Sequence, residues 1–215
     1  VIVGYGRDRV MEHLQGRARF AVQAEQLGTG HAVMMAREYL QGFRGAVVVM
    51  AGDMPLIRGE TIRALVERVE AGAAVALLSA MAEEPFGYGR ILRDGTGAVR
   101  GIVEERDATD AQRAIREVNA SVYAFRCEQL LSVLDQLTAN NAQRQYYLTD
   151  AVHMLIQKGE RAEVLTLSNM DQCAGINDRL QLAEADRAMR DAFRDGGDWV
   201  SPERLAPVLA WLDGD

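Results

Sequence analysis

A lone aspartate follows a continuous apolar run, Gly45–Ala51, in the segment Ala51-Gly52-Asp53-Met54-Pro55-Leu56. Such a run is typical of a strand covered on both faces, so Asp53 is expected at the carboxyl edge of an α/β sheet, where ligands bind. A single carboxylate there suits Mg²⁺, which completes its shell with substrate phosphates and water. Gly52 leaves room for a close-packed ligand. The alternative interpretation is that Asp53 caps the following segment.

A glycine-containing turn, Gly28-Thr29-Gly30, precedes an expected helix. Backbone N–H groups at a helix start can face an anion or the edge of a base. The carboxamide of Gln23 or Gln26 also matches the pairing edge of uracil, which presents an acceptor, a donor and an acceptor. Gly-Thr-Gly alone is equally typical of a plain turn.

Three further residues have side chains or backbone groups that suit a sugar. Glu104 and Asn119 stand at the ends of expected strands, where a carboxylate and an amide can bind hydroxyl groups and an amide carbonyl. Gly89, in Gly87-Tyr88-Gly89-Arg90-Ile91, has a backbone N–H that an acetyl oxygen can approach without a clash. Each residue taken singly also fits ordinary turn or strand-edge structure.

Asn177 opens a long expected helix in Gly175-Ile176-Asn177-Asp178-Arg179. Its default interpretation is a helix cap, and its amide oxygen could equally face a metal ion.

The elements that must position these residues alternate between strand and helix in the first half of the chain. This order predicts an α/β fold with a doubly wound, mostly parallel sheet and helices on both faces. Later strands follow one another directly, and the turn at 94–97 joins two of them. A further helix is expected to start at Ser201-Pro202. Strands are expected at 1–5, 19–23, 45–51, 73–81, 88–93, 98–104, 117–125 and 163–167, and helices at 7–14, 30–40, 60–71, 128–137, 148–158 and 176–193. The helix at 60–71 is expected to have an apolar stripe on one side, formed by Ile62, Leu65, Val66 and Val69.

Composition narrows the class of protein. Of the 215 residues 48% are hydrophobic and 26% charged, which is ordinary for a globular domain. With a net charge of −7 and no basic stripe, nucleic acid is not an expected partner. No apolar run approaches the roughly 20 residues of a membrane helix, so no membrane partner is expected. Cys127 and Cys173 indicate neither a disulfide framework nor a zinc site, which fits a reducing cytoplasm.

Taken in order, the segments resemble the uridyltransferase domain of bacterial N-acetylglucosamine-1-phosphate uridyltransferases. The resemblance runs from about Val1 to about Arg187 and implies the nucleotide-diphospho-sugar transferase (Rossmann-like) fold. It also implies a cytoplasmic enzyme that joins UTP to N-acetylglucosamine 1-phosphate, giving UDP-N-acetylglucosamine, a precursor for peptidoglycan and the cell wall, and pyrophosphate. The segments that carry it are Gln23–Ala32, Gly52–Leu56, Gly87–Ile91, Ile102–Ala108, Glu117–Tyr123, Asn140–Gln143, Tyr146–Asp150 and Gly175–Arg179.

The resemblance also implies roles for single residues. No side chain is expected to act as a general base, because a sugar phosphate, with its second pKa near ~6, is already an anionic nucleophile. Mg²⁺ is the expected cofactor, held by Asp53 and Asn177. The nucleotide would be bound by Gln23, Gly28, Thr29, Ala51, Gly52 and Asp53, and the sugar by Gly89, Glu104, Asn119 and Asn177.

The chain also departs from the family. The family's opening strand, its glycine-rich loop with Arg, and the Lys that follows would all lie upstream of Val1. We therefore expect residues 1–187 to be a nucleotidyltransferase domain lacking that strand and loop, and 188–215 to be a helical extension. Ala120-Ser121 replaces a small polar residue and a glycine, Gln145 replaces Glu, and Arg106 replaces Lys.

Three alternatives remain open at this stage. The chain could use another sugar 1-phosphate such as glucose 1-phosphate, or it could be a non-catalytic subunit that binds nucleotide sugars. A glycosyltransferase is less favoured, because the Asp-x-Asp triplet of that class occurs only at Asp213-Gly214-Asp215.

Overall fold

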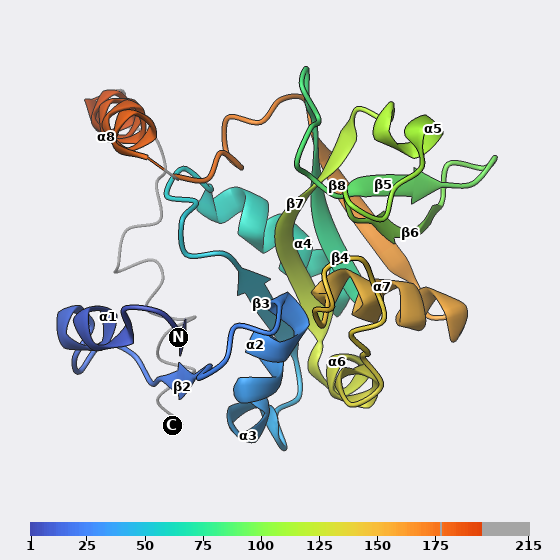
Figure 1. Cartoon of the computed structure of the whole chain (residues 1–215), viewed down its shortest axis with the longest axis horizontal. Coiled ribbons are helices and arrows are strands. Elements are labelled where there is room, and N and C mark those ends of the chain that lie inside the picture. The colour runs from blue at the N-terminus through green and yellow to red at the C-terminus, as the bar shows by residue number, and fades with distance from the viewer. Residues whose placement is uncertain (177, 195–215) are drawn as a thin grey trace.

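Helices and strands form largely where the apolar patterns predict them. The computed structural model describes residues 1–176 and 178–194 (Figure 1). The strands are β1 (Ile2–Val3), β2 (Ala21–Val22), β3 (Ala46–Met50), β4 (Val75–Met81), β5 (Arg90–Arg93), β6 (Val99–Val103), β7 (Glu117–Arg126) and β8 (Ala162–Leu167). The helices are α1 (Arg7–His13), α2 (Thr29–Met35), α3 (Arg37–Leu40), α4 (Gly59–Glu70), α5 (Asp110–Arg113), α6 (Cys127–Leu134), α7 (Leu148–Gln157) and α8 (Arg179–Arg194).

The main sheet is mixed rather than mostly parallel. Its order is β6-β5-β7-β4-β8, and β3 pairs with β7 on the same side as β5. β4 and β8 run parallel, and β7 runs antiparallel to both β3 and β4. β3, β4 and β8 therefore point the same way, as expected, but β7 is inserted between β3 and β4. Sequence periodicity cannot reveal this insertion, because it gives no strand partners or directions.

Both faces of the sheet are covered by helices, which confirms the expected α/β class. Side chains alternate along β4: Val75 and Leu77 join a core with α2, α6 and α7, whereas Ala76 and Leu78 join a second core with α4. The apolar stripe predicted on α4 is confirmed, since its members pack into that second core. They are Ile62, Leu65, Val66 and Val69.

The strand that precedes Asp53 has an open edge. Within residues 1–176 and 178–194, β3 hydrogen-bonds to β7 on one side and to no strand on the other. Ala46 and the three valines of β3 are only partly buried and Met50 is exposed, although the sequence is wholly apolar. β1 and β2 form a separate parallel two-stranded sheet beside α1 and α2.

Several boundaries differ from the sequence prediction. The helix expected at 30–40 is split, because Ala36 takes φ −87° and ψ 0°, ending α2 and starting α3. α8 begins at Arg179 rather than at residue 176 and crosses the expected boundary at 187/188 without a break. The helix expected at Ser201-Pro202 lies outside the described residues.

No helix of the described residues has the length and apolar character that crossing a bilayer requires. Cys127 and Cys173 are both buried and free. Burial raises the pKa of the Cys173 thiol to about 11, so this side chain is a core residue rather than a reactive one.

Candidate active site

The carboxylate of Asp53 is exposed just beyond the carboxyl end of β3. Ala51 and Gly52 beside it are exposed too, and a side chain added at Gly52 would meet no atom within 4 Å. The Asp53 carboxylate forms no hydrogen bond or ion pair with the described residues. We call this exposed segment, Ala51–Asp53, the ledge. Its open surface fits a ligand that approaches the backbone closely.

A long-range hydrogen bond brings the segment before α8 to the same ledge. The backbone N–H of Ile176 donates to the carbonyl oxygen of Asp53 at 2.9 Å. Asn177 itself lies outside the described residues. Among the described residues, Asp178 makes capping bonds of α8: its carboxylate accepts from the N–H of Gln181 at 2.8 Å. The sequence signal for this is the Asp-x-x-Gln spacing.

Within the described part of the chain, no group of three or more His, Cys, Asp or Glu side chains could hold a metal ion. The expected magnesium site has one carboxylate and one amide oxygen, a donor set that Mg²⁺ accepts when phosphates and water complete its shell. The exposed carboxylate of Asp53, which has no partner among the described residues, fits that set.

The Gly28-Thr29-Gly30 turn is held against the segment before α7. A side chain on Gly28 (φ 113°) would meet the carbonyl oxygen of Tyr146 at 2.5 Å. The Gly30 N–H donates to that oxygen at 2.8 Å, and the Thr29 hydroxyl oxygen accepts from the N–H of Leu148 at 3.0 Å. Close backbone approach therefore explains both glycines, and the nucleotide role of Gly28 and Thr29 stays a prediction.

Gln23 is nearly buried beside this turn. Its amide nitrogen donates to the carbonyl oxygen of Gly28 at 3.0 Å and lies 3.0 Å from the Nδ1 atom of His31. Two partners use both hydrogens of the amide nitrogen, so the carbonyl oxygen is the group left for a base. A contact of Gln23 with uracil stays a prediction, and it would use this oxygen.

Gly89, Glu104 and Asn119 lie together, although 30 residues of sequence separate the first from the last. The Asn119 N–H donates to the carbonyl oxygen of Gly89 at 2.8 Å. A side chain on Gly89 would come within 3.3 Å of the Glu104 Oε2 atom. The sequence prediction that these residues act together is consistent with this arrangement.

The cluster adjoins the ledge. Met50, the last residue of β3, pairs with Val122 of β7, and the two strands are antiparallel. The chain therefore leaves β3 toward Asp53 alongside the part of β7 that holds Ser121 and Asn119. Two predicted subsites, one for a metal and nucleotide and one for a sugar, thus share one edge of the sheet.

A cavity of about 260 Å³ opens beside Glu104. It is polar, with three carboxylates in its wall. The Tyr146–Asp150 segment has no role predicted from sequence, but three of its residues line the cavity. The lining residues are Ile102, Val103, Glu104, Asp107, Asn140, Asn141, Tyr147, Thr149 and Asp150.

Burial raises the pKa of the Glu104 carboxyl above its ordinary value of 4.5. The hydrogen bond that its Oε1 accepts from the Thr149 hydroxyl at 2.9 Å opposes this, and the Asp150 and Asp107 carboxylates add to it. Because the folded-state pKa exceeds the unfolded one, the stability contributed by Glu104 is greatest below pH 4.5. It is lost as pH rises through the folded pKa.

Glu104→Gln is therefore expected to raise the thermal midpoint at pH 7, because a neutral amide replaces a carboxylate that is partly stripped of water. The gain should shrink at pH 4, where Glu104 is largely protonated in both states. Calorimetric melting of both proteins across this range checks the sign. A variant that is less stable than the parent at pH 7 would contradict it.

Asn119 is 4% exposed and stands at an irregularity of β7. Its amide nitrogen donates to the Tyr123 hydroxyl at 2.6 Å, and its amide oxygen accepts from the Ser121 N–H at 3.2 Å. The pairing with β4 shifts register between Leu77 and Ser79, which is a β-bulge. Bulges often re-aim side chains next to active sites.

Ser121 has φ 55° in this bulge, in the left-handed region that favours glycine. Ser121→Gly is expected to increase the free energy of unfolding by about 1 kcal/mol, because the clash of Cβ with the backbone is removed. Urea denaturation measures the change. Ser132→Gly, in helix α6, should have the opposite sign, and a destabilising Ser121→Gly would show that the bulge is not strained.

The chain belongs to the nucleotidyl transferase family, whose model matches residues 3–213. This membership confirms the predicted class of enzyme. A glucose-1-phosphate thymidylyltransferase from Bacillus anthracis, described as putative, superposes with a TM-score of 0.66. It covers 88% of this chain and 75% of that one at 17% identity, and so supports the fold.

Within that class the chain resembles a particular group of bacterial proteins, each named bifunctional protein GlmU. The protein from Geobacillus thermodenitrificans is 44% identical over 88% of this chain and 42% of its own length. Those from Pelotomaculum thermopropionicum and Thermobifida fusca are 44% and 45% identical over all of this chain and 47% and 46% of theirs. The chain spans about half the length of these curated relatives. The resemblance found from sequence segments is confirmed.

Proposed function

We propose that this domain transfers the uridylyl group of UTP to N-acetylglucosamine 1-phosphate, giving UDP-N-acetylglucosamine and releasing pyrophosphate. The observation that carries the proposal is the shared sheet edge. There the exposed carboxylate of Asp53 follows β3 alongside the Gly89–Glu104–Asn119 cluster. A nucleotide phosphate on the ledge and a sugar at the cluster would meet between them.

Asn119 and Glu104, in the proposed sugar subsite, have hydrogen-bonding groups that the fold does not use. Asn119 uses one amide hydrogen and one lone pair within the fold, which leaves one of each for a ligand such as an acetamido group. Glu104 keeps its Oε2 atom beside Gly89, where it can accept from sugar hydroxyl groups. Charge-assisted bonds of that kind are stronger than neutral ones.

On the nucleotide side, Gln23 would accept from the uracil N3–H with its carbonyl oxygen, next to Gly28 and Thr29. Ala51 and Gly52 would line the nucleotide. Asp53 and Asn177 would hold Mg²⁺, which when bound neutralises charge on the phosphates.

The reaction needs little proton transfer from the protein. The sugar phosphate is an anionic nucleophile at neutral pH, since its second pKa is near ~6. Fixing its oxygen in line with the α-phosphate and neutralising charge there should supply most of the rate acceleration. The geometry therefore fits a site without a general base.

We also propose that residues upstream of Val1 complete the nucleotide subsite and the sheet. The open apolar edge of β3 supports this, because an unpaired edge strand exposes backbone hydrogen-bonding groups as well as valine side chains. A strand placed there would end beside Asp53, from where a following loop could reach the phosphates. Residues 1–187 would then be most of the catalytic domain, and 188–215 an extension of it.

The test is pyrophosphate release from UTP with and without N-acetylglucosamine 1-phosphate, in the presence of Mg²⁺. It is run on the 215-residue chain and on the full-length natural protein. Release from the full-length protein that requires both substrates is expected, with little release from the shorter chain. Binding without turnover in the full-length protein would instead identify a non-catalytic subunit. Rapid turnover by the 215-residue chain would show that an upstream loop is dispensable.

A further inference from the structure

An ion pair between a buried arginine and a partly exposed glutamate adjoins the residues of the proposed sugar subsite. The side chain of Arg90 is 1% exposed, and its Nη2 atom donates to the Glu105 Oε2 atom at 2.7 Å. The same nitrogen donates to the carbonyl oxygen of Arg113 at 3.2 Å, and Nη1 donates to that of Tyr88. Arg90 is among the largest fully buried side chains of the described residues.

The Arg90–Glu105 pair is not expected to be more stable than apolar side chains in the same place. Within the described residues the Nε atom of Arg90 is buried with no hydrogen-bond partner. An unsatisfied buried donor costs about 1–3 kcal/mol, and a buried ion pair can often be replaced by apolar side chains without loss of stability. Packing alone therefore does not explain an arginine here.

The pair joins the segments on which the sugar residues stand. Arg90 directly follows Gly89, and Glu105 directly follows Glu104. Glu104 is bonded to Thr149 of α7, whereas Glu105 faces Arg90 and Arg113. The two glutamates thus point to different partners, one toward the cavity and one toward the ion pair.

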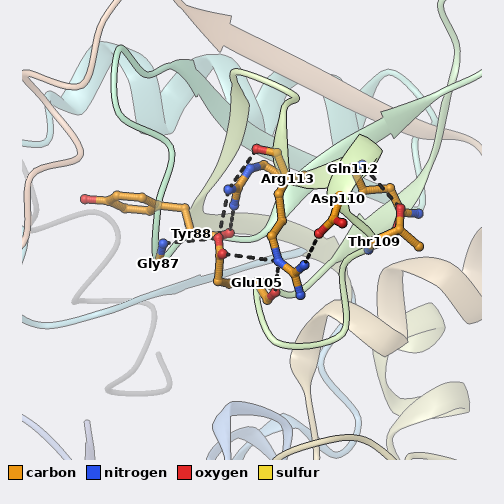
Figure 2. A network of polar contacts seen from close by, with 8 residues as sticks. Gly87, Tyr88, Glu105, Thr109, Asp110, Gln112 and Arg113 are labelled. Carbon is orange, nitrogen blue, oxygen red and sulfur yellow. Dashed lines mark hydrogen bonds and ion pairs between the residues drawn. The ribbon is translucent and has the colours of Figure 1, made fainter.

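Glu105 also holds the loop that leads into Gly89. Its Oε2 atom accepts from the Gly87 N–H at 3.2 Å, and Figure 2 shows Glu105 between Gly87 and Arg113, with the Tyr88 ring pointing away from the network. Gly89 is therefore fixed from one side by Asn119 and from the other by bonds to Gly87 and Tyr88. The Arg90 hydrogen bond lowers the pKa of Glu105, so the pair is ionised at neutral pH.

We propose that Arg90 and Glu105 are positioning residues that set the distance between Gly89 and Glu104 and so determine affinity for the sugar 1-phosphate. The proposal rests on the proposed function, because it assigns a role relative to that sugar. Neither residue need touch the substrate.

The experiment compares Glu105→Gln with Glu163→Gln in the full-length protein. Glu163 is a matched control, because it also pairs with two arginines, Arg68 and Arg161, but lies on β8 away from the cluster. Glu105→Gln is expected to raise KM for N-acetylglucosamine 1-phosphate roughly tenfold, since small misplacements of binding groups are costly. KM for UTP should stay within about twofold of the parent. Glu163→Gln should leave both unchanged.

A double variant, Arg90→Met with Glu105→Gln, separates positioning from stability. Removing both charges should restore the melting temperature lost in Glu105→Gln, because no unpaired buried charge remains. KM for the sugar phosphate should stay raised, because the Arg90 bonds to Tyr88 and to residue 105 are lost and the Gly87 N–H no longer has a charged acceptor. Recovery of that KM together with stability would overturn the proposal, as would equal KM values for Glu105→Gln and Glu163→Gln. A parent protein that turns over no sugar 1-phosphate would instead remove the proposed function, and this inference with it.

Discussion

Asp53→Asn is expected to lower kcat/KM for pyrophosphate release by roughly 10²-fold or more in the full-length protein. Charge stabilisation by a metal ion is worth several kcal/mol, and each 1.36 kcal/mol is about a factor of ten in rate. The Asp53 carboxylate is exposed and has no ion-pair or hydrogen-bond partner in the described residues, so its loss should hardly affect folding. A ligand role predicts that the Mg²⁺ concentration for half-maximal rate rises as well.

The control is Asp135→Asn, which removes an exposed carboxylate paired with Arg37 far from the ledge in sequence and fold. It should leave both the rate and the Mg²⁺ dependence unchanged. If Asp53→Asn kept the parental Mg²⁺ dependence, Asp53 would not be a metal ligand.

Asn119→Ala is expected to raise KM for N-acetylglucosamine 1-phosphate by roughly 5- to 150-fold while KM for UTP changes little. Loss of one buried polar contact costs about 1–3 kcal/mol. The increase in KM should be smaller for glucose 1-phosphate, because this sugar has no acetamido group to hydrogen-bond with the Asn119 amide. Steady-state kinetics with both sugar phosphates measures the difference.

Tyr123→Phe is the matched control for this change. It removes the same 2.6 Å hydrogen bond from Asn119 but leaves the amide in place, and Tyr123 is buried against Phe125. Its effect should be on stability, with sugar affinity retained. Equal losses for both sugars in Asn119→Ala would remove the N-acetyl assignment and favour the glucose 1-phosphate alternative.

Local patterns were sufficient to predict most of the elements. The apolar spacing on α4 gave its buried face, and the 94–97 turn forms as expected, with the Asp94 N–H donating to Ala98. α5 was not predicted, although its Thr109–Gln112 capping box was present in the sequence. Its single turn is too short to show an apolar period.

Long-range pairings could not be predicted in the same way. Insertion of β7 between β3 and β4, the bond from Ile176 to Asp53 and the contact of Gly28 with Tyr146 all depend on chain topology. The burial of Arg90 could not be predicted either, because an arginine in a strand is usually exposed. The candidate site was predicted only as separate residues, and the fold supplies their proximity.

A competition assay tests the proposed substrate most directly. The full-length protein is given UTP, Mg²⁺ and equal concentrations of N-acetylglucosamine 1-phosphate and glucose 1-phosphate, and the two nucleotide sugars are separated and quantified early in the reaction. The ratio of products equals the ratio of kcat/KM values for the two sugars. If the Glu104–Asn119 cluster recognises the acetamido sugar, UDP-N-acetylglucosamine should exceed UDP-glucose by roughly tenfold or more. Equal amounts, or an excess of UDP-glucose, would contradict that assignment.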